Sequence, residues 1–191
     1  SILLLALALT YRGLISSRYN EAFAEATRAS ELSPFRADAY RLRGHICFLR
    51  GLRAGRWMDH AVSDFDRAIR SEPNFGEADN NRGLAYHAKG ETDKAIADLE
   101  KAIQLLPNSA TPYSNRGAVY LSKGDHDNAI ADLDKAIELD PRFSKAYYNR
   151  GLTYLDLGNY DRAIDDLEQA IEFTPEEISM MLRKMPTGES S

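Results

Sequence analysis

The chain has 191 residues, of which 43% are hydrophobic and 28% charged, and its net charge at pH 7 is -5. This acidic balance argues against nucleic acid as a partner, because nucleic-acid-binding domains carry a basic surface, and the single cysteine rules out an internal disulfide. The charge is uneven: residues 1–57 hold nine arginines and four acidic residues, so they total +5 and the rest of the chain totals -10. Such asymmetry would steer a charged partner, or else it is a solvated pattern with no specific use.

A pattern in residues 110–143 recurs 34 residues away in both directions. The triplet Asn-Arg-Gly begins at residues 81, 115 and 149, the pair Ala-Ile begins at 95, 129 and 163, and proline stands at 107, 141 and 175. Self-similarity at a period of this length is typical of a solenoid, in which each unit buries its apolar face against its neighbours. We therefore predict an array of repeated units.

The chain begins with an apolar run over residues 2–9. The run is too short to span a membrane, and no basic residue precedes it as in a signal peptide, although a signal-peptide core stays open as an alternative. Further along, Ala22, Ala26 and Ala29 have the spacing of the small residues in the later units. We therefore expect residues 3–36 to be a degenerate first repeat.

The second unit, residues 37–75, is five residues longer than the others. The surplus lies between its two predicted helices, within residues 50–57, and insertions in repeat proteins often carry a binding function. Arg53, Arg56 and Trp57 are therefore a candidate secondary contact for an acidic or aromatic partner group. The alternative is that Leu52 and Trp57 fold back to cover helix ends. Cys47 takes a core position and is expected to be buried.

Three regular units follow, at residues 76–109, 110–143 and 144–177. In the central one, Tyr113, Gly117, Tyr120 and Leu121 lie on one stripe of a first helix, and Gly117 leaves room for close helix approach. Residues 122–125 break that helix, and residues 140–141, Asp-Pro, end the next. The inner stripe of this second helix consists of apolar residues at helical spacing: Ala129, Ile130, Leu133, Ala136 and Ile137.

After the last unit, Ile178, Met181, Leu182 and Met185 are spaced as one apolar face of a helix. We expect residues 178–191 to form a capping helix and a tail, because the open end of a solenoid needs a cover with a polar outer side.

The units resemble the tetratricopeptide repeat (TPR) family. Its 34-residue repeat has an aromatic residue at position 4, Gly or Ala at 8, Tyr at 11, Ala at 20, a bulky residue at 24, Ala at 27 and Pro at 32. The central unit holds these residues at Tyr113, Gly117, Tyr120, Ala129, Leu133, Ala136 and Pro141. The unit after it also agrees, and the unit before it departs only at position 4, which is Asp79.

The resemblance implies an all-α fold, a right-handed superhelix (α-solenoid) of antiparallel helix pairs that forms a single TPR domain over residues 1–191. It also implies a scaffold that is not an enzyme and that binds a protein or an extended peptide in its concave groove. Self-association, or a regulatory role within a larger enzyme, are the alternatives. A soluble, cytoplasmic protein is favoured over an exported one.

Two polar positions recur. Position 7, usually apolar in the family, is Arg43, Arg82, Arg116 and Arg150, and position 23 is Asp64, Asp98, Asp132 and Asp166. The first unit has Leu9 and Glu25 instead, so the arginine is absent where the aspartate is absent. We predict a structural ladder in which each arginine reaches an aspartate of the same or an adjacent repeat.

Position 6 is Asn81, Asn115 and Asn149, and in the family it faces the groove. An amide can donate to and accept from a peptide backbone, although a hydrogen bond within the scaffold is the alternative. The residues expected to line the groove are Asn80, Asn81, Leu84, His87, Ser114, Asn115, Lys145, Tyr148 and Asn149. The carboxylate clamp of chaperone-binding TPR domains is disfavoured, because Asn80, Leu84 and Asn149 stand where it needs Lys, Asn and Arg.

Metal-ligand and phosphate-binding motifs are missing from the sequence, so we expect no cofactor and no metal. His45 and His87 both fall on the groove side, but a metal site there is disfavoured. Residues 125–128 superficially resemble a calcium loop without its glycine, and are expected to be a turn and the N-cap of the next helix.

Overall fold

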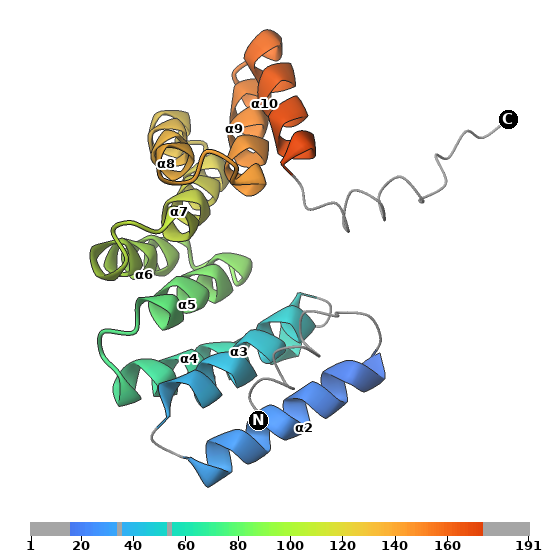
Figure 1. Cartoon of the computed structure of the whole chain (residues 1–191), viewed down its shortest axis with the longest axis vertical. Coiled ribbons are helices and arrows are strands. Elements are labelled where there is room, and N and C mark those ends of the chain that lie inside the picture. The colour runs from blue at the N-terminus through green and yellow to red at the C-terminus, as the bar shows by residue number, and fades with distance from the viewer. Residues whose placement is uncertain (1–15, 34–35, 53–54, 174–191) are drawn as a thin grey trace, which may run out of the picture. The chain divides into compact units, whose positions relative to one another are not determined.

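The structure of the chain, a computed structural model, describes residues 16–33, 36–52 and 55–173 (Figure 1). Within these ranges every regular element is a helix, which confirms the all-α prediction. The first part of the degenerate repeat, the capping helix expected after residue 177, and Arg53 lie outside the described residues.

The chain divides into two compact units, the first ending at Pro107 and the second beginning at Asn108. The described helices of the first unit are α2 (Ser16–Leu32), α3 (Ala37–Gly51), the short 3-10 helix η1 (Gly55–Trp57), α4 (Met58–Ser71), α5 (Gly76–Ala88) and α6 (Thr92–Leu105). Here α3 pairs with α4 and α5 with α6, while α2 packs on α3 and α4 on α5. The first unit is thus a stack of helix pairs.

The second unit repeats the same arrangement. Its described helices are α7 (Ala110–Lys123), α8 (His126–Leu139), α9 (Ser144–Asp156) and α10 (Tyr160–Glu172). Here α7 pairs with α8 and α9 with α10, while α8 and α7 both contact α9. The helices α3, α5, α7 and α9 begin at the residues where the sequence period places the start of a unit. The expectation of one domain over the whole chain stays a prediction.

In each regular unit, a glycine in the left-handed region follows the end of the first helix. Gly90, Gly124 and Gly158 have φ values of 78°, 76° and 71°. At Gly124 the next amide, that of Asp125, donates to the carbonyl of Tyr120 at 3.0 Å, and Gly124 donates to Leu121 at 2.9 Å. This Schellman pair satisfies the carbonyls that the helix end leaves free. Asp125 then accepts from the Asn128 amide, so the N-cap predicted within residues 125–128 is confirmed, and Asp125 is the capping residue.

Each first helix contacts its partner through a second glycine. A Cβ built on Gly117 would lie 2.8 Å from Leu133 Cγ, and one on Gly83 would lie 2.9 Å from Leu99 Cγ. A larger residue would push the paired helix away, because protein interiors hold few voids. The close approach predicted for Gly117 is therefore confirmed.

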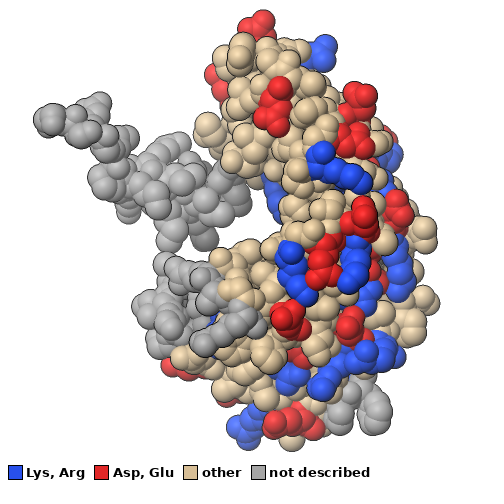
Figure 2. Space-filling view, turned by 180° about the vertical axis from the view of Figure 1, so that it is seen from behind, with Lys and Arg blue, Asp and Glu red and all other residues tan. Residues whose placement is uncertain are grey.

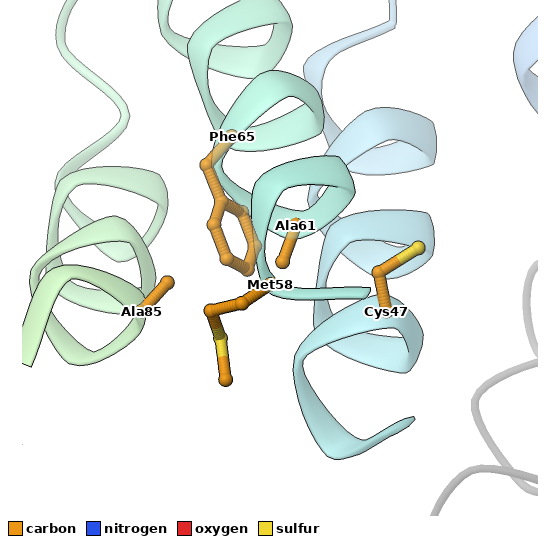
Figure 3. Close-up of a cluster of buried hydrophobic side chains, with 5 residues drawn as sticks. All are labelled: Cys47, Met58, Ala61, Phe65 and Ala85. Carbon is orange, nitrogen blue, oxygen red and sulfur yellow. The ribbon is translucent and has the colours of Figure 1, made fainter. Parts of the chain in front are cut away.

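The buried side chains follow the repeated stripe of small and large residues. Ala129, Leu133 and Ala136 are fully buried in α8, as predicted. In the first unit, Cys47 of α3 packs with Met58, Ala61, Phe65 and Ala85 between α3, α4 and α5 (Figure 3). Cys47 is buried as expected, and that burial raises the pKa of its thiol to about 12. None of the described helices combines the length and the apolar content needed to cross a bilayer.

Candidate functional site

The recurring arginines form bidentate ion pairs with the recurring aspartates. In each pair Nε and Nη2 donate to the two carboxylate oxygens at 2.6 to 2.8 Å. The pairs, here called the Arg–Asp rungs, are Arg43–Asp64, Arg82–Asp98, Arg116–Asp132 and Arg150–Asp166. The predicted ladder is confirmed, and each rung joins the two helices of one repeat.

Two rungs also reach the preceding repeat. Nη1 of Arg82 donates to Asp66 at 2.6 Å, and Nη1 of Arg150 donates to Asp134 at 2.5 Å. Burial alone would lower the pKa of Arg82, but the hydrogen bonds that it donates to Asp98 and Asp66 raise it. These contacts hold successive repeats together by charge-assisted bonds. Acidic and basic side chains are accordingly interspersed on the face shown in Figure 2.

Asp79 replaces the aromatic residue at position 4. It is fully buried, with one oxygen 3.1 Å from Lys101 Nζ and 3.7 Å from Arg82 Nη2. The other oxygen makes no hydrogen bond within the described ranges. Burial raises the pKa of Asp79, although Lys101 and Arg82 oppose the shift. At the position where the family has an aromatic residue, this repeat thus has a buried carboxylate. Its charge is compensated only in part, by Lys101 of α6 and by Arg82.

In the second unit, α7 and α9 bring five of the candidate groove residues into one region. Lys145 Nζ donates to Asn115 Oδ1 at 2.7 Å, which joins the two first helices. The protein around the Lys145 ammonium removes water from it and lowers its pKa, although the side chain as a whole is exposed. Tyr148 is 50% exposed, whereas Ser114, Asn115 and Asn149 are buried. The accessible part of this region is therefore Lys145 and Tyr148.

The asparagines at position 6 have different surroundings. Asn115 is 1% exposed and accepts from Lys145, whereas Asn149 is 8% exposed and its Nδ2 makes no hydrogen bond within the described part of the chain. Asn81 is half-buried and accepts from Asn80 Nδ2 at 3.2 Å. For Asn115 this geometry favours a scaffold role, the alternative that the sequence left open.

The candidate groove residues of the first unit lie on α5. Leu84 and His87 are half-buried, and Asn80 is buried. The Nδ1 atom of His87 is buried without a hydrogen bond among the described residues, and burial lowers the pKa of this imidazole. The candidate residues on α5 include an apolar side chain, Leu84, but no lysine comparable to Lys145 of α9.

The insertion places Trp57 against the scaffold. The Trp57 ring meets Phe23 edge-on at 5.6 Å and lies 5.6 Å from His60, and the Arg50 guanidinium stacks 3.8 Å from its centre. The alternative to a binding role was that both Leu52 and Trp57 fold back onto the helices. Trp57 does so, but Leu52 does not, because its side chain is 59% exposed. Of Arg53 and Arg56, the structure describes no side chain.

A cavity of about 360 Å³ lies beside Trp57, and the sequence did not reveal it. The residues lining this Trp57 cavity come from α2, α3, η1 and α4: Phe23, Arg43, Cys47, Trp57, His60, Ser63, Asp64 and Arg67. Its lining is spread over 45 positions of the chain, from residue 23 to 67, so no local motif marks it.

Within the described ranges, no three His, Cys, Asp or Glu side chains are grouped so that they could hold a metal ion. His45, one of the two histidines considered for such a site, stacks on Phe48 at 6.4 Å between ring centres, and burial lowers its pKa. Its surroundings are those of a packed side chain.

Comparison with known proteins agrees with this architecture. A family model described as TPR repeat matches residues 83–124 and 117–158, and a second, described as tetratricopeptide repeat, matches 144–176. No curated protein sequence matches the chain.

Among solved structures, a thermophilic TPR protein of Thermus thermophilus, TTC0263, is 23% identical with a TM-score of 0.80, covering 95% of this chain and 94% of its own. MamA is 26% identical with a TM-score of 0.65, covering 86% and 92%. YrrB, titled a TPR protein with an unusual peptide-binding site, is 23% identical with a TM-score of 0.59, covering 94% and 89%. With the repeated helix pairs and the family matches over residues 83–176, these likenesses lead to one conclusion: the chain belongs to the tetratricopeptide repeat family.

Proposed function

We infer that this TPR protein is a protein-interaction scaffold, and we propose that an extended segment of its partner binds along the exposed surface of α7 and α9. Repeats of this family typically bind partners and carry no chemistry themselves. The observation that carries the proposal is the pairing of an exposed aromatic ring, Tyr148, with the oriented ammonium of Lys145 on one face.

The two side chains have complementary uses. Lys145 has three N–H donors, and its bond to Asn115 leaves others for a backbone carbonyl or a carboxylate of the peptide. Tyr148 offers a flat apolar ring with a polar tip, which contributes contact area at little cost in side-chain entropy. Buried Asn115 would then orient the lysine from below. The peptide-binding site of the TPR protein YrrB is consistent with this use of the fold.

The test is a selection of binding peptides from a displayed random library against the intact chain, followed by affinity measurements with single variants. We expect Lys145→Ala and Tyr148→Ala each to weaken the selected peptides about tenfold. Matched controls are Lys135→Ala on α8 and Tyr160→Ala on α10, where Tyr160 is 66% exposed. Equal affinity for all four variants would refute this surface as the binding site.

One observation favours a second candidate, self-association. Ile164 and Ile171 of α10 are 55% and 69% exposed, whereas their equivalents in α8, Ile130 and Ile137, are half-buried. Ile137 packs with the core that includes Ala146 of α9, and no described helix follows α10 in the same way. Analytical ultracentrifugation of the wild type beside Ile164→Lys tests it, since only self-association through α10 predicts a dimer that the charge disrupts.

A further inference from the structure

The first Arg–Asp rung lacks a carboxylate that two later rungs possess. Nη1 of Arg82 and of Arg150 donates to an aspartate at position 25 of the preceding repeat. In the first repeat that position is Thr27, and Nη1 of Arg43 instead donates to the Ser30 hydroxyl at 3.0 Å. The Thr27 hydroxyl is buried and makes no hydrogen bond within the described ranges. The first rung is therefore one negative charge short.

The shortage occurs at the Trp57 cavity, because Arg43 and its partner Asp64 both line it. The cavity also receives Arg67, which is exposed, as well as His60 and Ser63. Among the described residues of the lining, Asp64 is the sole acidic side chain, and both of its oxygens accept from Arg43. The cavity thus holds two guanidinium groups against one neutralised carboxylate.

Two further lining residues, Phe23 and Trp57, give the cavity aromatic walls, and Tyr40 lies next to its two arginines. Phe23 and Trp57 meet edge-on, and the guanidiniums of Arg43 and Arg67 lie 5.6 and 5.7 Å from the Tyr40 ring centre. Arg43 already donates from all three of its nitrogens, but Arg67 can offer its N–H edge to a carboxylate, because stacking on a ring uses only the face of a guanidinium. Positive charge beside aromatic walls suits an acidic side chain with an apolar neighbour.

We propose that the Trp57 cavity binds a carboxylate side chain from an acidic segment of a partner protein, which supplies the negative charge that Thr27 does not. The cavity lies in the first unit and shares no residue with the surface of α7 and α9, which lies in the second. Arg43 and Cys47 are one turn apart on α3, whereas His45, predicted from the sequence to lie on the groove side, is about half a turn of the helix away from both. The volume of about 360 Å³ accommodates one acidic side chain and part of its neighbour.

Trp57 provides a site-specific signal, because it is the only tryptophan in the chain. Its fluorescence is followed while the intact protein is titrated with acetyl-Glu-Phe-Glu-amide, and in parallel with acetyl-Gln-Phe-Gln-amide, acetate and inorganic phosphate. We expect saturable binding of the acidic peptide, at least about tenfold tighter than that of its amide analogue, and weaker at high salt. Equal binding of the two peptides would overturn the proposal, and so would equal binding of acetate or phosphate, since that would mean an adventitious anion only.

Two variants locate the binding. Thr27→Asp places a carboxylate at the position that Asp66 and Asp134 occupy in later repeats, so it should weaken binding of the peptide about tenfold, whereas Thr27→Asn should not.

Arg67→Gln should weaken binding to a similar extent, whereas Arg28→Gln, exposed on α2 outside the cavity, should not. Circular dichroism confirms folding, and if Thr27→Asp does not fold, the Arg67 pair decides. Unchanged affinity in Arg67→Gln would refute the site. Tyr148→Ala should leave the signal intact, which separates this proposal from the one on α7 and α9.

Discussion

Two rungs of the first unit, those of Arg82 and Arg43, place the same residue at the same repeat position in different electrostatic surroundings. Arg82 lies among three carboxylates, those of Asp98, Asp66 and the buried Asp79. Arg43 has one carboxylate, that of Asp64, and a serine hydroxyl. The arginine is therefore part of the scaffold in both repeats. Its neighbours decide whether its positive charge is fully compensated by carboxylates, as at Arg82, or compensated by only one, as at Arg43.

The largest effect should come from Arg82→Leu. It strands the buried carboxylate of Asp98, leaves buried Asp79 with Lys101 as its remaining cation, and removes the bond to Asp66 of the preceding repeat. Removing one partner of a buried ion pair is strongly destabilising, so we expect a loss of about 4 kcal/mol in the free energy of unfolding. Urea denaturation followed by circular dichroism measures it. A loss below about 1 kcal/mol would show that the rung does not stabilise the stack.

Arg43→Leu should cost less, about 2 to 3 kcal/mol, because it strands only Asp64. The same denaturation experiment checks the order of the two variants. The double variant Arg43→Leu with Asp64→Leu should recover much of the loss, because no buried charge is then left without a partner. If Arg43→Leu proved the more damaging of the two, the number of carboxylates would not be the deciding difference.

Asp79→Asn should change how stability depends on pH. Burial raises the pKa of Asp79 above its ordinary 3.8, so the folded state binds this proton more tightly than the unfolded state. The resulting stabilisation is present below about pH 3.8 and is lost as the pH rises through the raised folded value. Asparagine resembles the protonated acid. The free energy of unfolding of the variant should therefore exceed that of the wild type by about 1 kcal/mol at pH 7 and equal it at pH 3.5.

Denaturation midpoints of Asp79→Asn and the wild type at both pH values test this, with Glu77→Gln, exposed on the same helix, as the control. A destabilised Asp79→Asn at pH 7 would mean that Lys101 and Arg82 outweigh the burial of the carboxylate.

The smallest effect is expected from Thr27→Asp, which would make the first rung resemble that of Arg82. A second carboxylate beside Arg43 should stabilise the fold by about 0.5 to 1 kcal/mol at low salt, and by less at high salt. Thermal unfolding at two salt concentrations, with Thr27→Asn beside it, measures the difference. A lower midpoint for the aspartate than for the asparagine would argue against a deficit of negative charge at this rung.

Comparison of the repeats with one another predicted the helix pairs, the close approach at Gly117 and all four Arg–Asp rungs. It could do so because each of these features recurs at a fixed spacing. The reach of Arg82 and Arg150 to the preceding repeat was foreseen only as one of two alternatives. Spacing along one chain does not tell which neighbouring helix a long side chain meets.

The candidate site was less predictable. Position 6 repeats as asparagine, yet Asn115 is buried under Lys145 while Asn81 pairs with Asn80. The Trp57 cavity depends on Phe23, on the course of the insertion and on an arginine of α4, residues that no motif connects.

By itself, the sequence determined the repeat, the helix pairs within it and the oppositely charged residues that form each rung, because these follow from short-range periodicity and from residue type. Only the tertiary structure decided which of the repeated polar groups are buried, which are saturated and which line a cavity. The physical reason is that burial and charge compensation are set by side chains from several helices at once. A single substitution on one of them, such as threonine for aspartate at position 25, alters the surroundings of a residue on another.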